Sequence, residues 1–140
     1  MYTLKTSACF DSAHFLKGYE GKCGNIHGHR WKVEAEIAGE RLEETGSTRS
    51  MLFDFSAFKE SLKVHTDALD HVLIIERGSL KETTMQALSE EGFAICEMDF
   101  RPTAECFAKY FYELLTKDGY PVKRCTVYET PRNCASYEES

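Results

Sequence analysis

Hydrophobic and polar residues alternate most regularly between residues 27 and 39. One parity carries imidazoles followed by apolar side chains, and the other is charged; the two sets are His27, His29, Trp31, Val33, Ala35 and Ile37 against Arg30, Lys32, Glu34 and Glu36. A period of two is typical of a strand with one buried face. Residues 2–15 alternate in the same way, with Phe10 and His14 on one parity. We therefore predict two long strands, paired antiparallel through a glycine-marked loop at 16–26.

Two later segments show the helical period instead. In the first, apolar side chains recur at helical spacing after Asp54, the predicted N-cap, so we expect a helix to about Leu69 with a short strand entry at 51–54. In the second, the capping-box pattern Ser79-Leu80-Lys81-Glu82 predicts a short extra helix in the 76–92 connection.

The most regular helical pattern begins after Pro102, with Thr103 as the predicted N-cap and Gly119 at the end. Its apolar face comprises Ala104, Phe107, Ala108, Phe111, Leu114 and Leu115. A strand at about 122–130 follows, and the tail from Tyr137 onward is expected to fray.

This order of elements indicates the α+β class, an antiparallel sheet with two main helices packed on one face. The 140 residues suffice for one domain, 1–140, with a buried core. So small a sheet leaves long edges that must be covered, which favours edge-to-edge oligomerisation.

The composition argues against several classes of function. The formal net charge of −6 disfavours a nucleic-acid-binding surface, which is normally basic. No segment approaches the length of a membrane span, and the N-terminal residues lack the apolar core of a signal peptide. The six cysteines are interpreted as free thiols, because a chain of this size and pattern is not a disulfide-stapled mini-domain. We expect a cytoplasmic protein without nucleic-acid or membrane partners.

Three of the five histidines, His14, His27 and His29, are predicted to converge at one end of the sheet. A lone histidine on an apolar face is usually a hydrogen-bonded core residue, whereas three together are typical of a metal site, with Zn²⁺ as the default ion. Cys23 lies four positions before His27. Three interpretations of its thiol remain open: buried filler, a fourth ligand that closes a structural site, or a base and nucleophile beside an open catalytic site.

Two further places in the sequence carry ionisable side chains, the Asp70-His71 pair and Glu129. Asp70 and His71 follow the first predicted helix, where a histidine at a helix C-terminus is a simpler interpretation than an acid–base pair. Glu129 shares a strand face with apolar residues, and an inward carboxylate is unfavourable unless it is paired, so it suits a ligand rich in N–H donors. His65 has no partner in sequence and is expected to be solvated.

Taken together, six pieces of the sequence resemble the 6-pyruvoyltetrahydropterin synthase and 6-carboxytetrahydropterin synthase family, and they cover most of the chain. The pieces are Phe10-Asp11-Ser12-Ala13-His14, Cys23-x3-His27-Gly28-His29, Asp54-Phe55 with Phe58-Lys59, Leu69-Asp70-His71, Pro102-Thr103-Ala104-Glu105 and Tyr128-Glu129-Thr130. Their order and separation along the chain argue against chance agreement.

The resemblance implies a tunnelling fold (T-fold), with a four-stranded antiparallel sheet and two helices on one side. Three subunits would close their sheets into a barrel and two trimers would stack, with active sites at subunit boundaries. It also implies roles for nine residues: Zn²⁺ ligands His14, His27 and His29, the catalytic base Cys23, the proton-transfer residues Asp70 and His71, the pterin anchor Glu129, and Thr103 and Glu105 near the pterin pocket.

The three residues between Cys23 and His27 resemble the members that form 6-carboxytetrahydropterin, since pyruvoyl-forming members have a longer gap. The implied reaction converts 7,8-dihydroneopterin triphosphate into 6-carboxy-5,6,7,8-tetrahydropterin, acetaldehyde and triphosphate, in queuosine and 7-deazapurine biosynthesis. Two alternatives stay open, namely a pyruvoyl-forming or side-chain-cleaving pterin synthase and a non-catalytic, zinc-stabilised oligomeric scaffold. The segment from Ile74 to Arg101 is longer than in compact bacterial members.

Overall fold

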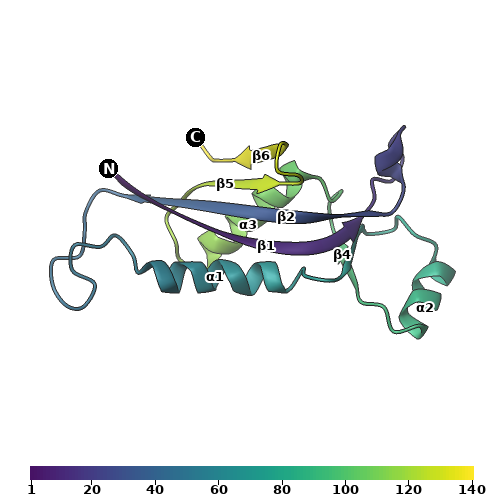
Figure 1. Ribbon diagram of the computed structural model, residues 1–140, viewed down its shortest axis with the longest axis horizontal. Coiled ribbons are helices and arrows are strands. Elements are labelled where there is room, and N and C mark those ends of the chain that lie inside the picture. The colour runs from purple at the N-terminus through teal and green to yellow at the C-terminus, as the bar shows by residue number, and fades with distance from the viewer.

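The chain folds around one curved six-stranded sheet, seen in the computed structural model of residues 1–140 (Figure 1). The strand order is β4-β3-β1-β2-β5-β6. The strands are β1 (Tyr2–His14), β2 (His27–Gly39), β3 (Leu73–Glu76), β4 (Ile95–Met98), β5 (Val122–Tyr128) and β6 (Cys134–Tyr137). The helices are α1 (Phe55–Asp67), α2 (Glu82–Glu90) and α3 (Ala104–Lys117), with a short 3-10 turn η1 (Lys22–Gly24) between β1 and β2. No helix combines the length and apolar character needed to cross a membrane.

The two long strands pair antiparallel without interruption, from Tyr2 opposite Gly39 to His14 opposite His27. Alternate side chains therefore leave on one face, where α1 and α3 cover them. The shared core is formed by Phe10, Trp31, Val33, Ala35 and Ile37 of the strands with Phe58, Leu62, Phe107, Phe111 and Leu115 of the helices. Both long-strand predictions are confirmed, and the packing of two main helices on one face is confirmed with them.

The ends of the main helices follow their predicted caps. The Asp54 side chain accepts a hydrogen bond from the backbone N–H of Ser56, and the Thr103 hydroxyl accepts one from Cys106. Each cap satisfies an N–H group that has no partner within the helix. In contrast, residues 51–54 form no strand, so that expectation is wrong.

The short helix in the 76–92 connection is confirmed as α2, but its predicted cap is wrong. Lys81 occupies the N-cap position and makes no side-chain cap hydrogen bond. Ser79 lies two residues too early to cap the helix, and its buried hydroxyl has no hydrogen-bond partner. Figure 1 shows α2 standing apart from the two main helices, beyond the end of the long strands.

The expected four-stranded antiparallel sheet is wrong, because the sheet has six strands and is mixed. The apolar run after His71 forms β3, which pairs parallel with the last two residues of β1, and β4 pairs parallel with β3. At the other edge, β6 pairs antiparallel with β5, so Tyr137 belongs to a strand and not to a frayed tail. The three missed strands have four residues each, too few for an alternation to be recognised.

Candidate metal centre and surrounding residues

Three imidazoles meet where β1 ends and β2 begins. His14 and His27 are direct cross-strand partners, and His29 is two residues further on the same face of β2. The ring centroids lie 4.6 Å apart for His14 and His27, 5.2 Å for His14 and His29, and 4.8 Å for His27 and His29. One ligand atom from each ring lies within 4.8 Å of the others. The predicted convergence of the three histidines is confirmed.

Hydrogen bonds at the far side of two rings determine where their protons lie. His14 Nδ1 is 2.8 Å from the carbonyl oxygen of Pro102, and His27 Nδ1 is 2.7 Å from that of Asn25. A carbonyl can only accept, so each Nδ1 carries the hydrogen and each neutral ring presents a lone pair at Nε2. These two Nε2 atoms face each other at 3.1 Å. Two lone pairs at this distance require a cation or a shared proton between them.

The environment also favours neutral imidazoles. His14 is buried, and desolvation by burial is the main cause that lowers its pKa to about 4, with further lowering by His27 and His29 against an opposing hydrogen bond to Pro102. Burial likewise lowers the pKa of His29, partly opposed by Glu129. Neutral imidazole is the form that binds metal ions. His29 Nε2 is buried without a hydrogen-bond partner. Three such nitrogens fit Zn²⁺ with a fourth position open.

Cys23 lies in η1, between the two long strands. The groups close enough to share an ion are the three imidazoles alone, so the thiol is not a fourth ligand in this geometry. No residue of η1 is buried, so Cys23 is not core filler either. Of the three interpretations left open by the sequence, a base beside an open site stays a prediction.

Asp70 and His71 form a pair at the edge of β1. The Asp70 carboxylate accepts hydrogen bonds from the backbone N–H of Asp11 and from His71 Nδ1, both at 2.8 Å. These contacts, the Asp11 N–H first, hold the pKa of Asp70 below its usual range. His71 has a φ of 60°, and its backbone N–H donates to the Asp11 carbonyl at 2.7 Å. Because α1 already ends at Asp67, the pair is not a simple helix C-terminus.

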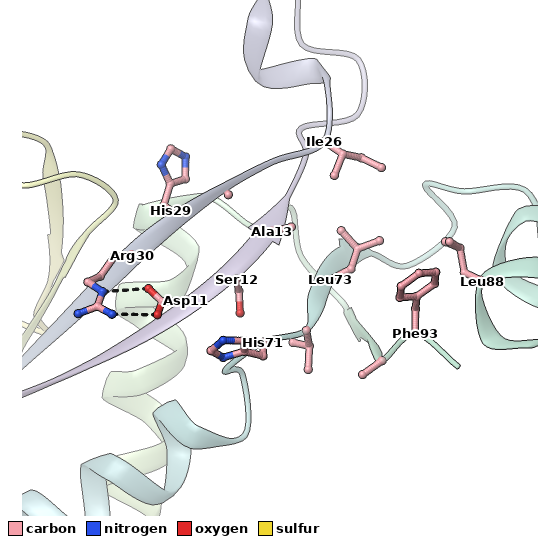
Figure 2. Close-up of a pocket in the computed structure, with 13 residues that line it drawn as sticks. Asp11, Ser12, Ala13, Ile26, His29, Arg30, His71, Leu73, Leu88 and Phe93 are labelled. Carbon is pink, nitrogen blue, oxygen red and sulfur yellow. Dashed lines mark hydrogen bonds and ion pairs between the residues drawn. The ribbon is translucent and has the colours of Figure 1, made fainter. Parts of the chain in front are cut away.

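His71 belongs to a cavity of about 720 Å³ that is lined by both polar and apolar side chains (Figure 2). Its lining includes the bidentate ion pair between Arg30 and Asp11, which lies on the sheet face without α1 and α3. Figure 2 shows the His71 ring on one side of the two long strands and His29 projecting on the other. No hydrogen bond or ring contact joins His71 to the three imidazoles. His29 and His71 nevertheless line the same cavity, so the metal centre and the Asp70–His71 pair border one hollow.

Glu129 follows the last residue of β5 and approaches the metal centre. Its Oε1 lies 3.3 Å from His29 Nε2, although the two atoms are not aligned for a hydrogen bond. Its side chain is 29% exposed and lines a second cavity of about 580 Å³, together with Tyr128 and Lys32. The Glu129 carboxylate thus lies between the imidazole of His29 and the second cavity.

Thr103 and Glu105 start α3, the first as its N-cap and the second as an acidic residue in the first turn. Neither lines one of the two cavities. His65, expected to be solvated, instead places Nε2 2.6 Å from the Asp118 carboxylate, so that expectation is wrong.

Sequence reasoning missed the groups that orient the imidazoles. The carbonyls of Pro102 and Asn25 have no side-chain signature, so no residue pattern could have identified them. Asp11 could have been identified, because it immediately follows Phe10 on the opposite parity and faces Arg30 across the strand pair.

Comparison with known proteins shows the family to which the chain belongs. Residues 3–140 match the family model for 6-pyruvoyl tetrahydropterin synthase. The chain is 34% identical to the 6-carboxy-5,6,7,8-tetrahydropterin synthase of Haemophilus influenzae, over 99% of this chain and 100% of that one. It is 37% identical to a putative 6-carboxy-5,6,7,8-tetrahydropterin synthase of Pyrococcus horikoshii, over 90% of this chain and 83% of that one.

Solved structures show the same fold at lower identity. An uncharacterized protein from Wolinella succinogenes superposes with a TM-score of 0.76 at 20% identity, covering 99% of this chain and 98% of that one. The 6-pyruvoyl tetrahydropterin synthase of Caenorhabditis elegans superposes with a TM-score of 0.67 at 22% identity, covering 99% and 96%. The chain belongs to the 6-pyruvoyl tetrahydropterin synthase family.

Proposed function

We propose that this protein is a zinc-dependent 6-carboxy-5,6,7,8-tetrahydropterin synthase, a carbon–carbon lyase of queuosine and 7-deazapurine biosynthesis. Its substrate is 7,8-dihydroneopterin triphosphate, and its products are 6-carboxy-5,6,7,8-tetrahydropterin, acetaldehyde and triphosphate. Atom balance requires one water molecule for each substrate consumed. The observation that carries the proposal is the pair of imidazole lone pairs at 3.1 Å with the Glu129 carboxylate 3.3 Å from the third ring.

The choice of product is supported by the relatives that match nearly the whole chain and carry this name. The three-residue gap between Cys23 and His27 agrees with that choice. No nicotinamide or flavin is needed, because the rearrangement is neutral in redox terms.

The chain supplies binding, orientation and proton transfer. His14, His27 and His29 would hold Zn²⁺, which when bound supplies Lewis acidity toward oxygens of the substrate side chain. Glu129 accepts hydrogen bonds from the 2-amino group and N3–H of the pterin, a donor pair that matches its two oxygens. Cys23 takes a proton from the substrate side chain as general base.

Asp70 and His71 complete the proton transfer in a neighbouring copy. The support is the 77% exposure of the His71 side chain, together with the lack of any hydrogen bond between His71 and the three imidazoles. Asp70 orients the ring by accepting from Nδ1, which leaves Nε2 free for a proton at a subunit boundary. Trimers that stack into a hexamer would provide such boundaries.

Features of the strand edges and surface fit this assembly. β3 covers β1 only at Ala13 and His14, so the outer edge of β1 from Tyr2 to Ser12 has no strand partner. An uncovered edge of this length is a site for pairing with another copy. Lys17 and Lys22 are exposed in the segment between the two strands that carry the histidines and are available to the triphosphate, whereas Arg30 is already paired with Asp11. All six cysteines are free, in keeping with a cytoplasmic enzyme.

Mass spectrometry of the products tests the proposal. Zinc-loaded protein is incubated with 7,8-dihydroneopterin triphosphate, and we expect 6-carboxytetrahydropterin to form. A 6-pyruvoyl product would show that the chain is a pyruvoyl-type synthase. Assembly with zinc but without turnover of any dihydropterin would indicate a scaffold.

A further inference from the structure

The segment 16–26, which carries Cys23, is a self-contained turn with few ties to the rest of the chain. Its internal backbone hydrogen bonds include those from Leu16 N–H to the Cys23 carbonyl at 2.9 Å and from Tyr19 N–H to the Leu16 carbonyl at 3.1 Å. No residue of η1 is buried, and Tyr19 is half exposed. Figure 1 shows the segment projecting beyond the ends of β1 and β2. Packing alone therefore gives little restraint on the thiol.

One residue from a distant part of the chain contacts this segment with its side chain. The Arg101 guanidinium donates a hydrogen bond from NH2 to the Lys17 carbonyl at 3.1 Å, and it lies over the Tyr19 ring at 6.0 Å from the centroid. The adjacent His27 bonds through its ring to the Asn25 carbonyl. Apart from His27, Arg101 is the one residue outside the segment whose side chain makes a hydrogen bond to it. A charged donor to a carbonyl and a cation over an aromatic face are both attractive.

Arg101 is not engaged elsewhere by an ion pair. Arg30, Arg77 and Arg124 each pair with carboxylates, whereas no acidic group lies within ion-pair distance of Arg101. Its Nε is buried without a hydrogen-bond partner. The two identified contacts of the guanidinium thus both lead to the segment that holds Cys23.

The backbone that carries Arg101 is fixed to the metal centre. Pro102 is buried, and its carbonyl holds His14 Nδ1 at 2.8 Å. Thr103 caps α3, and its N–H donates to the Arg101 carbonyl at 2.7 Å. An anchor at this junction therefore relates the 16–26 segment directly to the metal ligand His14.

We propose that Arg101 is a positioning residue that clamps the 16–26 segment and thereby sets Cys23 relative to the three imidazoles. The proposal rests on the proposed function, because it concerns the base of that reaction. Arg101 does not touch the reacting atoms in this role, and it acts through Lys17 and Tyr19.

The test compares Arg101→Ala, Arg101→Lys and Tyr19→Ala with Arg77→Ala, which removes an ion-paired surface arginine away from the metal centre. We expect Arg101→Ala to lower kcat about tenfold to a hundredfold, the range for losing a hydrogen bond to a charged donor, with KM changed less than about threefold. Arg101→Lys should restore part of kcat, Tyr19→Ala should resemble Arg101→Ala, and Arg77→Ala should match wild type. Bound zinc should remain at wild-type stoichiometry in all four.

A second readout does not depend on turnover. Peptide mapping after alkylation should show Cys23 modified about fivefold faster in Arg101→Ala, and amide exchange should rise within residues 16–26, because a released turn opens more often. If wild type turns over no pterin but these two changes appear, the proposed function fails and the clamp stands. Unchanged alkylation and exchange, a rise in KM alone, or loss of zinc from Arg101→Ala would each overturn the clamp.

Discussion

His14 Nε2 and His27 Nε2 lie 3.1 Å apart with a lone pair on each, because both Nδ1 atoms donate to backbone carbonyls. Such a contact is repulsive in an empty site and favourable around a cation. The two strands hold these rings at the ends of a continuous antiparallel register, so the repulsion cannot relax by a slip of one residue. The metal centre is thus built into the pairing of β1 with β2.

The first prediction concerns zinc and stability. One Zn²⁺ should bind per chain, and its removal by a chelator should lower the melting temperature by roughly 5–10 °C, since free ligand at 100 times Kd adds about 2.7 kcal/mol. His27→Ala should bind no zinc and should melt near metal-free wild type. His65→Ala, which removes an imidazole paired with Asp118 outside the centre, should keep its zinc. Metal analysis measures the bound zinc, and calorimetry measures the melting temperature. An unchanged zinc content in His27→Ala would contradict the ligand assignment.

The second prediction separates a base from a ligand at Cys23. Cys23→Ala should retain stoichiometric zinc and lose at least about a hundredfold in kcat, the range for removing a general base. Cys106→Ala, which alters a thiol on α3, is the matched control and should keep full activity. Loss of zinc together with the Cys23 thiol would show that the site is closed and structural.

The third prediction concerns recognition of the pterin ring. Glu129→Gln keeps the size of the side chain but removes its charge, so pterin affinity should fall about tenfold to a hundredfold, corresponding to roughly 1.5–3 kcal/mol. Zinc content should not change. Titration calorimetry with a dihydropterin measures the effect, with Glu82→Gln on α2 as the control for lost surface charge. Equal affinity in wild type and Glu129→Gln would remove the role assigned to this carboxylate.

The fourth prediction follows from the lowered pKa of Asp70. The folded state stabilises the ionised carboxylate, so its contribution to stability is complete above the ordinary pKa of 3.8 and is lost as pH falls through the lower folded pKa. Asp70→Asn should therefore be less stable than wild type near neutral pH. The difference should shrink below pH 3.8. Denaturant titrations of chelator-treated protein measure it, and a difference that grows on acidification would have the wrong sign.

The fifth prediction tests the aromatic core that packs against the metal centre. Phe107 is fully buried and packs against Trp31, whose ring lies 4.8 Å from that of His14. Phe107→Ala should lower the free energy of unfolding by about 3–5 kcal/mol, whereas Phe93→Ala, at a residue that is 62% exposed, should change it by less than about 1 kcal/mol. Urea titration compares the two, and similar losses would contradict the assigned core.

The sequence pattern predicts the long strands and main helices because each repeats its period over many residues. The alternation in β2 is visible since the apolar positions from Trp31 to Ile37 are fully buried, and Asp54 and Thr103 act as caps through local hydrogen bonds. β3, β4 and β6 could not be predicted in this way. Ile74 and Ile75 point to opposite faces and are both buried, so β3 shows no polar face, and its partner strand lies far away in the sequence.

The same distinction applies to the site, where only residues related by a local pattern could be predicted. His14, His27 and His29 could be brought together because strand parity and one hairpin register relate them. The position of His71 at the edge of β1 depends on its positive φ and on its backbone hydrogen bond to Asp11, neither of which is visible in a local pattern. The role of Arg101 has no sequence signal, because its partners are a backbone carbonyl and an aromatic face 80 or more residues away.

The most direct test of the central claim is the amount of acetaldehyde released for each triphosphate. Zinc-loaded wild-type protein is given 7,8-dihydroneopterin triphosphate, and both small products are quantified over the time course. The account predicts equal amounts of acetaldehyde and triphosphate, with no release by chelator-treated protein. Triphosphate without acetaldehyde, or equal release without zinc, would contradict it.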